Sequence, residues 1–241
     1  MRYLCEISYD GTKYNGFQKQ PNKKTIQREI EQTLCSVFKK EIKIFASGRT
    51  DKGVHAIGQC IHFDLEFEIK RNQIREILNR SISKDIVIKK VKKVSDNFHA
   101  RHSATSKKYV YKISKKSLSV FDRNYSIYIK NLDYEKMKKA ALDFVGNHDY
   151  KNFSKNDIPK PTNKTIFAVK ITESKRFLSF EIHGNSFLKY MVRKMIGTLL
   201  DIGKGKKDKD FIKKVFSNRE KNINIPSAPA CGLYLKKVYY K

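Results

Sequence analysis

The order of strand-like and helix-like segments is the feature of this sequence that most restricts its fold. Alternating apolar residues predict strands, and apolar residues at helical spacing predict helices. The segments follow one another roughly as strand–helix–strand–strand–helix–strand, and the same order begins again after residues 98–106. Two such cycles predict an α+β protein with two halves, 1–104 and 105–241, each a sheet backed by helices.

In the first half, strands are expected over 2–9, 41–46, 56–67 and 85–94, and helices over 25–39 and 72–80. In the second half, strands are expected over 106–114, 125–129, 165–172, 177–183 and 232–240, and helices over 133–145, 187–202 and 208–216. Residues 146–163 are expected to form a polar loop. Thr25 is the expected N-cap of its helix, because its hydroxyl can accept a hydrogen bond from the first turn.

The charge balance points to a polyanionic partner. The chain has 52 Lys and Arg against 24 Asp and Glu, which gives a formal net charge of +28. A surplus of this size favours nucleic acid as a partner. Most of the basic residues are Lys, so part of the surplus also fits a simple compositional bias. Where this Lys-rich chain places Arg in a motif, we expect that the planar guanidinium is required.

Cysteine usage and hydropathy restrict the class of protein further. The four cysteines (Cys5, Cys35, Cys60 and Cys231) are far apart and form no C-x-x-C pair. This argues against a zinc ribbon or a disulfide scaffold and suits a reducing compartment. The sequence has no apolar run of the roughly 18 residues that a membrane span needs. We therefore expect a soluble cytoplasmic protein without a membrane or metal partner.

The segment 46–58, ASGRTDKGVHAIG, carries the most chemical information. Its glycines predict a tight loop that presents a polar side chain. Asp51 lies between Arg49 and Lys52, and nearby positive charge keeps a carboxylate ionised. Such a carboxylate can act as a nucleophile, a base or a metal ligand, or it can simply cap a turn. Only His55 lies close enough to join it as a ligand, which disfavours a metal site.

The motif GRTDKGVHA resembles the catalytic motif of the tRNA pseudouridine synthase A (TruA) family. Four further blocks resemble that family's other motifs in the same order along the chain. They are ISYDGTKYNGFQ at 7–18, FHARHSATSKKYVY at 98–111, NSFLKYMVRKMIGTL at 185–199 and APACGLYL at 228–235. Two local departures are Phe17, where some relatives have Trp, and Cys231 in the last block. These departures affect the expected substrate range more than the chemistry.

The resemblance implies a fold and an activity. The fold is two RRM-like or ferredoxin-like halves with mixed, mainly antiparallel sheets backed by helices, and with the active-site cleft between them. The activity is the isomerisation of uridine to pseudouridine in the anticodon stem-loop of tRNA, at positions 38, 39 and/or 40, without a cofactor. The resemblance also implies a homodimer. The alternatives are a paralogue that acts on another site or on ribosomal RNA, and a non-catalytic RNA-binding or RNA-chaperone protein. A metal-dependent RNA nuclease is a third alternative, but it would require clustered carboxylates at metal spacing, which the sequence lacks.

The resemblance also assigns roles to individual residues. Asp51 is the expected catalytic carboxylate, Arg193 its ion-pair partner, and Arg49 a residue that holds the substrate geometry. Tyr109 is expected to pack on the target base and Leu233 to line the pocket. The plainer alternatives are a loop salt bridge for Arg49, core positions for Tyr109 and Leu233, and a solvent-facing side chain for Arg193. Tyr111 shares the strand face of Tyr109, and only the motif favours Tyr109.

Seven basic residues are expected to bind RNA phosphates. Such contacts give affinity and a steep salt dependence without reading sequence. For each of these side chains, a role as ordinary solvated surface is the competing interpretation. The seven are Lys13, Lys19, Lys23, Lys24, Arg101, Lys107 and Lys108.

Overall fold

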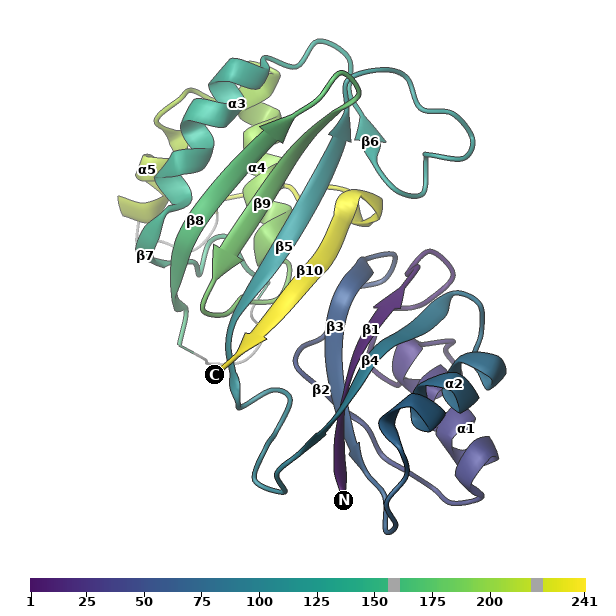
Figure 1. The fold of residues 1–241 in the computed structure, drawn as a ribbon. Helices are drawn as coiled ribbons and strands as arrows, with labels where there is room; N and C mark the ends of the chain where they lie inside the picture. The colour runs from purple at the N-terminus through teal and green to yellow at the C-terminus, as the bar shows by residue number, and fades with distance from the viewer. Residues whose placement is uncertain (156–160, 218–222) are drawn as a thin grey trace. The chain divides into compact units, whose positions relative to one another are not determined.

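The computed structural model describes residues 1–155, 161–217 and 223–241 and divides the chain into two compact units (Figure 1). Unit 1 comprises Met1–Thr105 and Tyr234–Lys241, and unit 2 comprises Ser106–Leu233. The first division lies next to the predicted boundary at 104/105. The second division was not anticipated: residues 234–241 group with unit 1, because they include a strand that pairs with unit 1.

The sheet of unit 1 contains five strands. Its elements are β1 (Arg2–Tyr9), α1 (Ile26–Phe38), β2 (Phe45–Ala46), β3 (His55–Asp64), α2 (Arg71–Ser81), β4 (Ile86–Val94) and most of β10 (Leu233–Tyr240). The strand order is β4-β1-β3-β10, and β2 also pairs with β3. β1 runs antiparallel to β3 and β4, whereas β10 runs parallel to β3. The predicted order of strands and helices is therefore confirmed in this unit.

The core of unit 1 lies between this sheet and its two helices. β1 alternates in burial, so that its odd-numbered residues from Tyr3 to Tyr9 face inward. α1 and α2 lie on one face of the sheet (Figure 1) and bury Ile30, Leu34 and Ile74, among others. Thr25 caps α1 as expected, and its hydroxyl accepts a hydrogen bond from the backbone N–H of Arg28 at 3.3 Å.

One strand of unit 1 is shorter than its sequence pattern predicts. Residues 41–46 alternate in burial as a strand would, with Ile42 and Ile44 buried. Only Phe45 and Ala46 pair with β3, opposite His62 and Ile61. Alternation therefore shows which side chains face inward, but not whether the backbone has a neighbouring strand.

Unit 2 has its own set of paired strands, backed by helices. Its elements are most of β5 (Ala104–Ser114), β6 (Ile127–Tyr128), α3 (Tyr134–Ala141), β7 (Gly146–Asp149), β8 (Asn163–Glu173), β9 (Phe177–Gly184), α4 (Met191–Gly203) and α5 (Phe211–Ser217), with 3-10 turns at Leu142–Phe144 and Ala230–Gly232. β5, β9, β8 and β7 follow one another as antiparallel neighbours, and β6 runs parallel to β5. The helices lie on one face of this sheet (Figure 1). The predicted class, α+β with mixed and mainly antiparallel sheets, is confirmed.

Local backbone geometry explains where unit 2 departs from the predicted elements. α4 begins at Met191 rather than at 187, because Tyr190 has a left-handed φ of 64° that no helix continues through. α3 ends at Ala141, and the remaining residues of the predicted helix tighten into a 3-10 turn. The predicted polar loop 146–163 contains β7, and its residues 156–160 lie outside the described part of the chain.

A cluster of imidazoles lies at one end of β3. The buried His62 ring lies 4.7 Å from His99 between ring centroids and stacks on Phe45 at 5.0 Å. Its Nδ1 accepts a hydrogen bond from the backbone N–H of Ala100 at 3.1 Å. Burial, together with the positive charge of Arg2 and the nearby His99, lowers the pKa of His62 to about 4, although Asp64 opposes the shift. The surroundings of His62 in the folded protein therefore favour its neutral form.

This pKa predicts an acid-sensitive stability. In the unfolded chain an imidazole titrates near 6.5, so the unfolded state takes up the proton first as the pH falls. The free energy of unfolding should therefore fall as the pH decreases from about 6.5 to 4. His62→Gln should flatten this part of the curve, as measured by urea unfolding at a series of pH values. His148→Gln removes an imidazole from unit 2 and serves as the control. An unchanged pH dependence in His62→Gln would contradict the prediction.

Candidate active site

The loop that carries Asp51 joins β2 to β3 in unit 1 and is anchored by a buried amide. The Ser47 hydroxyl donates to the side-chain oxygen of Gln59 at 2.6 Å, and the Gln59 amide nitrogen donates to the Gly48 carbonyl at 3.0 Å. Gln59 and Ser47 are fully buried. On the other side of the loop, the Asp51 carbonyl accepts a hydrogen bond from the Val54 N–H at 3.1 Å, which closes a tight turn. Both ends of the loop are thus held in place.

Thr50, the residue before Asp51, is held by contacts with the N-terminal motif. The buried Tyr9 and Thr50 hydroxyls lie 2.9 Å apart, within hydrogen-bonding distance. The N–H of Phe17 donates to the Thr50 carbonyl at 3.0 Å. Gly16 has φ +91°, and a Cβ there would lie 2.8 Å from the Thr50 oxygen and 3.3 Å from the Asp51 carbonyl carbon. The motif at 7–18 and the motif around Asp51 are thus in direct backbone contact, although they are far apart in the sequence.

The same two loops meet again at His55. Its Nδ1 accepts the N–H of Gly11 at 3.1 Å and lies 3.2 Å from a carboxylate oxygen of Asp10. The nearly buried ring stacks on Tyr234 of β10 at 4.7 Å. His55 therefore links the N-terminal loop to Tyr234 of β10. Over residues 1–155, 161–217 and 223–241, no group of three or more His, Cys, Asp or Glu is arranged to hold a metal ion.

The charged side chains of this loop are accessible. Asp51 is half-buried, whereas Arg49 and Lys52 on either side of it are exposed. The predicted loop is thus present in unit 1, with a partly accessible carboxylate flanked by two cations. Sequence reasoning missed the supporting residues Tyr9 and Gln59. Tyr9 lies in the motif at 7–18 but was given no role, and the only sequence signal of Gln59 is a polar group on the inward face of a strand.

Arg193 lies in the first turn of α4 in unit 2 and is held in place by the chain beside the helix. Its Nε donates to the Ala228 carbonyl at 2.8 Å, and the Ala228 N–H donates back to the Arg193 carbonyl at 2.9 Å. Its guanidinium carbon lies 5.1 Å from the centre of the Tyr190 ring, a cation–π distance. Arg193 is half-buried, so it is an oriented side chain rather than a loose surface arginine.

The segment from Pro226 to Leu233 lies between α4 and β5 within unit 2. A Cβ at Gly197 would lie 2.0 Å from the Pro226 oxygen, so only glycine lets this segment lie against the helix. Further along, Gly232 lies against the ring of Tyr111, and Leu233 is buried directly after it. The last sequence motif therefore shapes the surroundings of both Arg193 and the tyrosine strand.

The structure distinguishes the two tyrosines of β5. The Tyr111 hydroxyl donates to the Pro229 carbonyl at 2.8 Å, and burial raises the pKa of this phenol. Its role is structural. Tyr109, which is also largely buried, meets Phe187 edge-to-face at 5.0 Å between ring centroids. Phe187 lies just before α4, so aromatic packing links Tyr109 to the segment that leads into the arginine helix.

The predicted RNA-binding residues differ in their surroundings. Lys19 forms an ion pair with Glu31 at 3.1 Å, and Lys13 lies 3.9 Å from Asp85. Lys24 lies over the Tyr14 ring at 4.9 Å. These lysines, with Lys23 and Arg101, are exposed and belong to unit 1, whereas Lys107 and Lys108 are half-buried on β5 in unit 2. Lys19 is the least available of the unit 1 lysines for phosphate.

The turn that presents Arg101 is held by residues from both ends of the chain. Arg2 pairs with both oxygens of Asp64 at 2.8 Å and donates to the Phe98 carbonyl at 2.7 Å. The Tyr240 hydroxyl donates to the Ala100 carbonyl at 2.8 Å. These anchors carried no signal in the sequence, because each lies far along the chain from the turn it supports.

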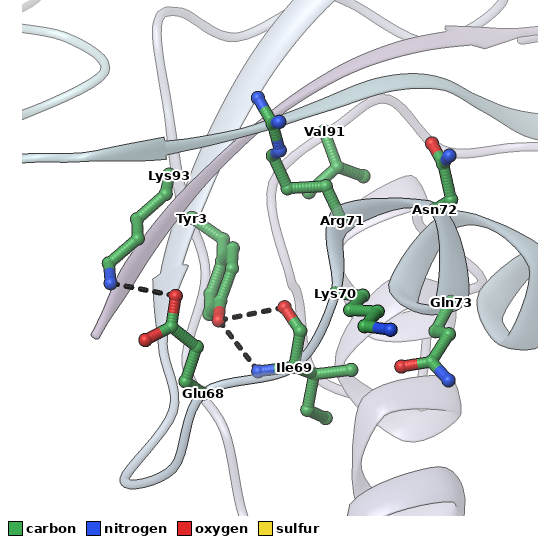
Figure 2. Close-up of a pocket in the computed structure, with 9 residues that line it drawn as sticks. All are labelled: Tyr3, Glu68, Ile69, Lys70, Arg71, Asn72, Gln73, Val91 and Lys93. Atoms are coloured by element: carbon green, nitrogen blue, oxygen red, sulfur yellow. Dashed lines mark hydrogen bonds and ion pairs between the residues drawn. The ribbon is translucent and has the colours of Figure 1, made fainter.

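A hollow of about 910 Å³ opens elsewhere in unit 1, between the start of α2 and strands β1 and β4. Figure 2 shows the Tyr3 hydroxyl there, bonded to the backbone of Ile69, and Lys93 paired with Glu68. None of the predicted site residues lines this hollow. This hollow is therefore not part of the candidate site.

The close approach at Gly16 gives a testable prediction. Gly16→Ala should lower the free energy of unfolding by more than about 1 kcal/mol, because alanine is strained at this φ and its Cβ meets the Thr50 carbonyl. Gly205→Ala is the matched control, since Gly205 also has a positive φ (+71°) but a Cβ added there would have no atom within 4 Å. Urea unfolding measures both. Equal losses in the two variants would contradict the role given to the contact.

Comparison with known proteins identifies the family. The family model described as tRNA pseudouridine synthase matches residues 7–103 and 140–241. A tRNA pseudouridine synthase A of Phytoplasma mali is 42% identical over 99% of this chain and 98% of its own length. Proteins of the same name from Geobacillus sp. and Bacillus pumilus are 42% and 39% identical, over 99% and 100% of this chain and 98% and 99% of their own lengths.

Among solved structures, a chain of a Cbf5-Nop10-Gar1 complex gives a TM-score of 0.33 at 10% identity over 83% of this chain and 54% of that one, a similarity too low to bear on fold or function. No described helix is both long and apolar enough to span a bilayer. The match of the family model and the near full-length identity to these three relatives show that the chain belongs to the tRNA pseudouridine synthase family.

Proposed function

We propose that this protein isomerises uridine to pseudouridine in the anticodon stem-loop of tRNA, at positions 38, 39 and/or 40, with Asp51 as the catalytic carboxylate. The observation that carries the proposal is family membership over nearly the whole chain, including the motif around Asp51. The anchoring of the Asp51 loop by Gly16, Tyr9 and Gln59 supports it, because catalysis requires a carboxylate held in a defined position.

The atoms of the reaction balance within the substrate. The N1–C1′ bond of uridine breaks, the base turns, and a C5–C1′ bond forms. C5 gives up its proton, and N1 carries a proton in the product. No atom or electron is gained or lost overall, so the reaction requires no redox cofactor. The protein's task is to bind the base, start the bond exchange and move a proton.

Asp51 can start this exchange by attack at C1′, by attack at C6 or by removal of a ribose proton. Attack requires an ionised carboxylate, and so does proton removal. We assign Arg193 as its ion-pair partner, since a guanidinium fork matches the two carboxylate oxygens and keeps them charged. The hydrogen bond from Nε to Ala228 supports this role because it fixes the direction of the terminal nitrogens.

The remaining residues act on the substrate in this proposal. A uracil inside a stem-loop must leave its stack to meet a carboxylate, at a cost of a few kcal/mol. Tyr109 packs on the flipped base, Leu233 lines the pocket, and Arg49 holds the flipped geometry. The commitment of the Tyr111 hydroxyl to Pro229 supports Tyr109 as the substrate-facing member of the pair.

Affinity for tRNA comes largely from phosphate contacts in this proposal. Lys13, Lys23, Lys24 and Arg101 are exposed on unit 1, and Lys107 and Lys108 are further basic residues on β5 in unit 2. Lys19 contributes less, because Glu31 already binds it. The enzyme acts as a homodimer in the cytoplasm, where its tRNA substrate is found.

The direct test is a pseudouridine map of tRNA incubated with the protein. Wild-type protein should produce pseudouridine at one or more of positions 38–40, whereas Asp51→Ala and Asp51→Asn should produce none. The physical reason is that both variants lack the ionised carboxylate, and Asp51→Asn retains its shape. Asp96→Asn, an exposed carboxylate in the same unit, is the control and should match wild type.

RNA binding separates this proposal from a non-catalytic role. The Asp51 variants should bind tRNA with nearly wild-type affinity in a filter-binding assay, because the basic surface is unchanged. Equal amounts of pseudouridine from wild type and Asp51→Asn would remove Asp51 from its role. No pseudouridine from wild type on any tRNA, with binding intact, would favour a non-catalytic RNA-binding protein.

The proposed ion pair gives a second prediction. Arg193→Lys should lower the single-turnover rate at least about tenfold, a loss of about 1.4 kcal/mol in transition-state stabilisation, while unfolding changes less. Lysine keeps the charge but loses the fork and the Nε bond to Ala228. Lys189→Arg, an exposed neighbour, is the control. A wild-type rate in Arg193→Lys would show that the planar guanidinium is not required.

A further inference from the structure

The segment Lys115–Ser126, between β5 and β6 in unit 2, presents apolar side chains to solvent. We call it the 115–126 loop; Figure 1 shows it as a long excursion from the sheet. The Phe121 side chain is 83% exposed, more than any other large hydrophobic residue in the described chain, and its neighbour Val120 is 65% exposed. Single exposed apolar residues are common, but an adjacent pair at a loop tip indicates a contact surface.

The tip is held by a hydrogen-bonded turn. The Ser119 hydroxyl donates to the Asp122 carboxylate at 2.6 Å, and the Asp122 N–H donates to the Ser119 carbonyl at 3.1 Å. The N–H of Tyr125 donates to the Asp122 carbonyl at 2.9 Å, and Arg176 of the β8–β9 turn pairs with the Asp122 carboxylate. The chain is thus folded so that the Phe121 side chain is left in solvent.

Exposed cations lie on the same loop and on the turn that contacts it. Lys116 and Arg123 are exposed on the loop, and Lys175 is exposed on the β8–β9 turn that contacts it. The two carboxylates of these segments are already engaged: Asp122 binds Arg176, and Glu173 binds Lys115 at 2.6 Å as well as Lys138. Neither Lys116 nor Arg123 forms an ion pair with any described residue. The surface around Phe121 is therefore positive, and the acidic groups of these two segments are neutralised.

This combination favours a polyanion that also offers a flat apolar face. An aromatic ring among cations is the arrangement that binds unpaired nucleotides, since the ring stacks on a base and the cations contact phosphate. A second copy of this chain docking tip to tip would bring the same exposed Lys116 and Arg123 to this surface, and like charges oppose close contact there. A membrane surface would need a larger apolar face than two adjacent side chains.

We propose that the 115–126 loop is a further RNA-contact surface, in which Phe121 stacks on an unpaired base of the tRNA and Lys116 and Arg123 bind the neighbouring phosphates. The inference rests on the proposed function, which makes tRNA the substrate. It adds a contact that none of the sequence motifs predicts. Stacking of this kind tolerates any base, so the loop contributes affinity and orientation rather than sequence recognition.

Fluorescence provides a direct test, because the chain has no tryptophan. Phe121→Trp places a single reporter at the tip, and added tRNA should quench its emission by stacking. Phe67→Trp is the matched control: Phe67 is another exposed phenylalanine, 54% exposed in unit 1, and its emission should change little. Absence of quenching at position 121 under conditions where tRNA binds would overturn the proposal.

Affinity measurements give an independent result. Phe121→Ala should weaken tRNA binding about tenfold, as expected for the loss of one base–aromatic stack, whereas Phe121→Tyr should restore it. Phe67→Ala should bind as wild type. The loss should be confined to RNA with unpaired bases and absent for a fully paired duplex of the same length. Equal losses on both RNAs, or none on either, would contradict stacking.

Three further measurements distinguish RNA stacking from the other possible roles of the loop. If Phe121→Ala changes the sedimentation of the protein but not its affinity for tRNA, the tip is a contact between copies of this chain and the proposal is wrong. A blue shift of Phe121→Trp with anionic vesicles but not with tRNA would assign it to membranes, with the same consequence. Pseudouridine mapping with wild type tests the proposed function separately, since enzyme activity can persist when the loop contact fails.

Discussion

The close contact between two stretches of backbone, Gly16 against the Thr50–Asp51 peptide, is the constraint on which the candidate site depends. It allows Phe17 to bond the Thr50 carbonyl and joins the N-terminal loop to the loop after β2. A carboxylate on an unsupported loop would sample many directions, and fixing it would carry an entropic cost. Here backbone geometry and the buried Tyr9 and Gln59 side chains restrict the loop that carries Asp51.

In unit 2, Arg193 is also held by a segment that lies far from it in the sequence. Gly197 admits the chain at Pro226 to the surface of α4, and Ala228 then exchanges hydrogen bonds with Arg193. The left-handed Tyr190 ends the preceding segment and places an aromatic ring beside the guanidinium. In both units a glycine permits the approach; in unit 1 hydrogen bonds then hold the loop that carries Asp51, and in unit 2 a hydrogen bond holds the Arg193 side chain itself. Positioning by distant backbone is thus a shared design of the two units.

Much of the fold was predictable because its signals are local. The alternation of β1 and the Thr25 cap follow from residues next to each other in the sequence. The importance of Asp51 and Arg193 came from motif resemblance rather than from periodicity. The pairing of β10 with β3, the short β2 and the late start of α4 were not predictable. They depend on which strand lies alongside, or on one backbone angle, and short-range patterns report neither.

The position of β10 has a consequence for biosynthesis. Its residues beside His55 and Ala56 follow the whole of unit 2 in the sequence. A ribosome therefore finishes unit 2 before the strand that lies next to β3 has been made. During that interval this edge of the first sheet has unpaired amides and carbonyls and can attract other strands. Nascent chains stalled before residue 234 should accordingly be the form of this protein most in need of chaperones.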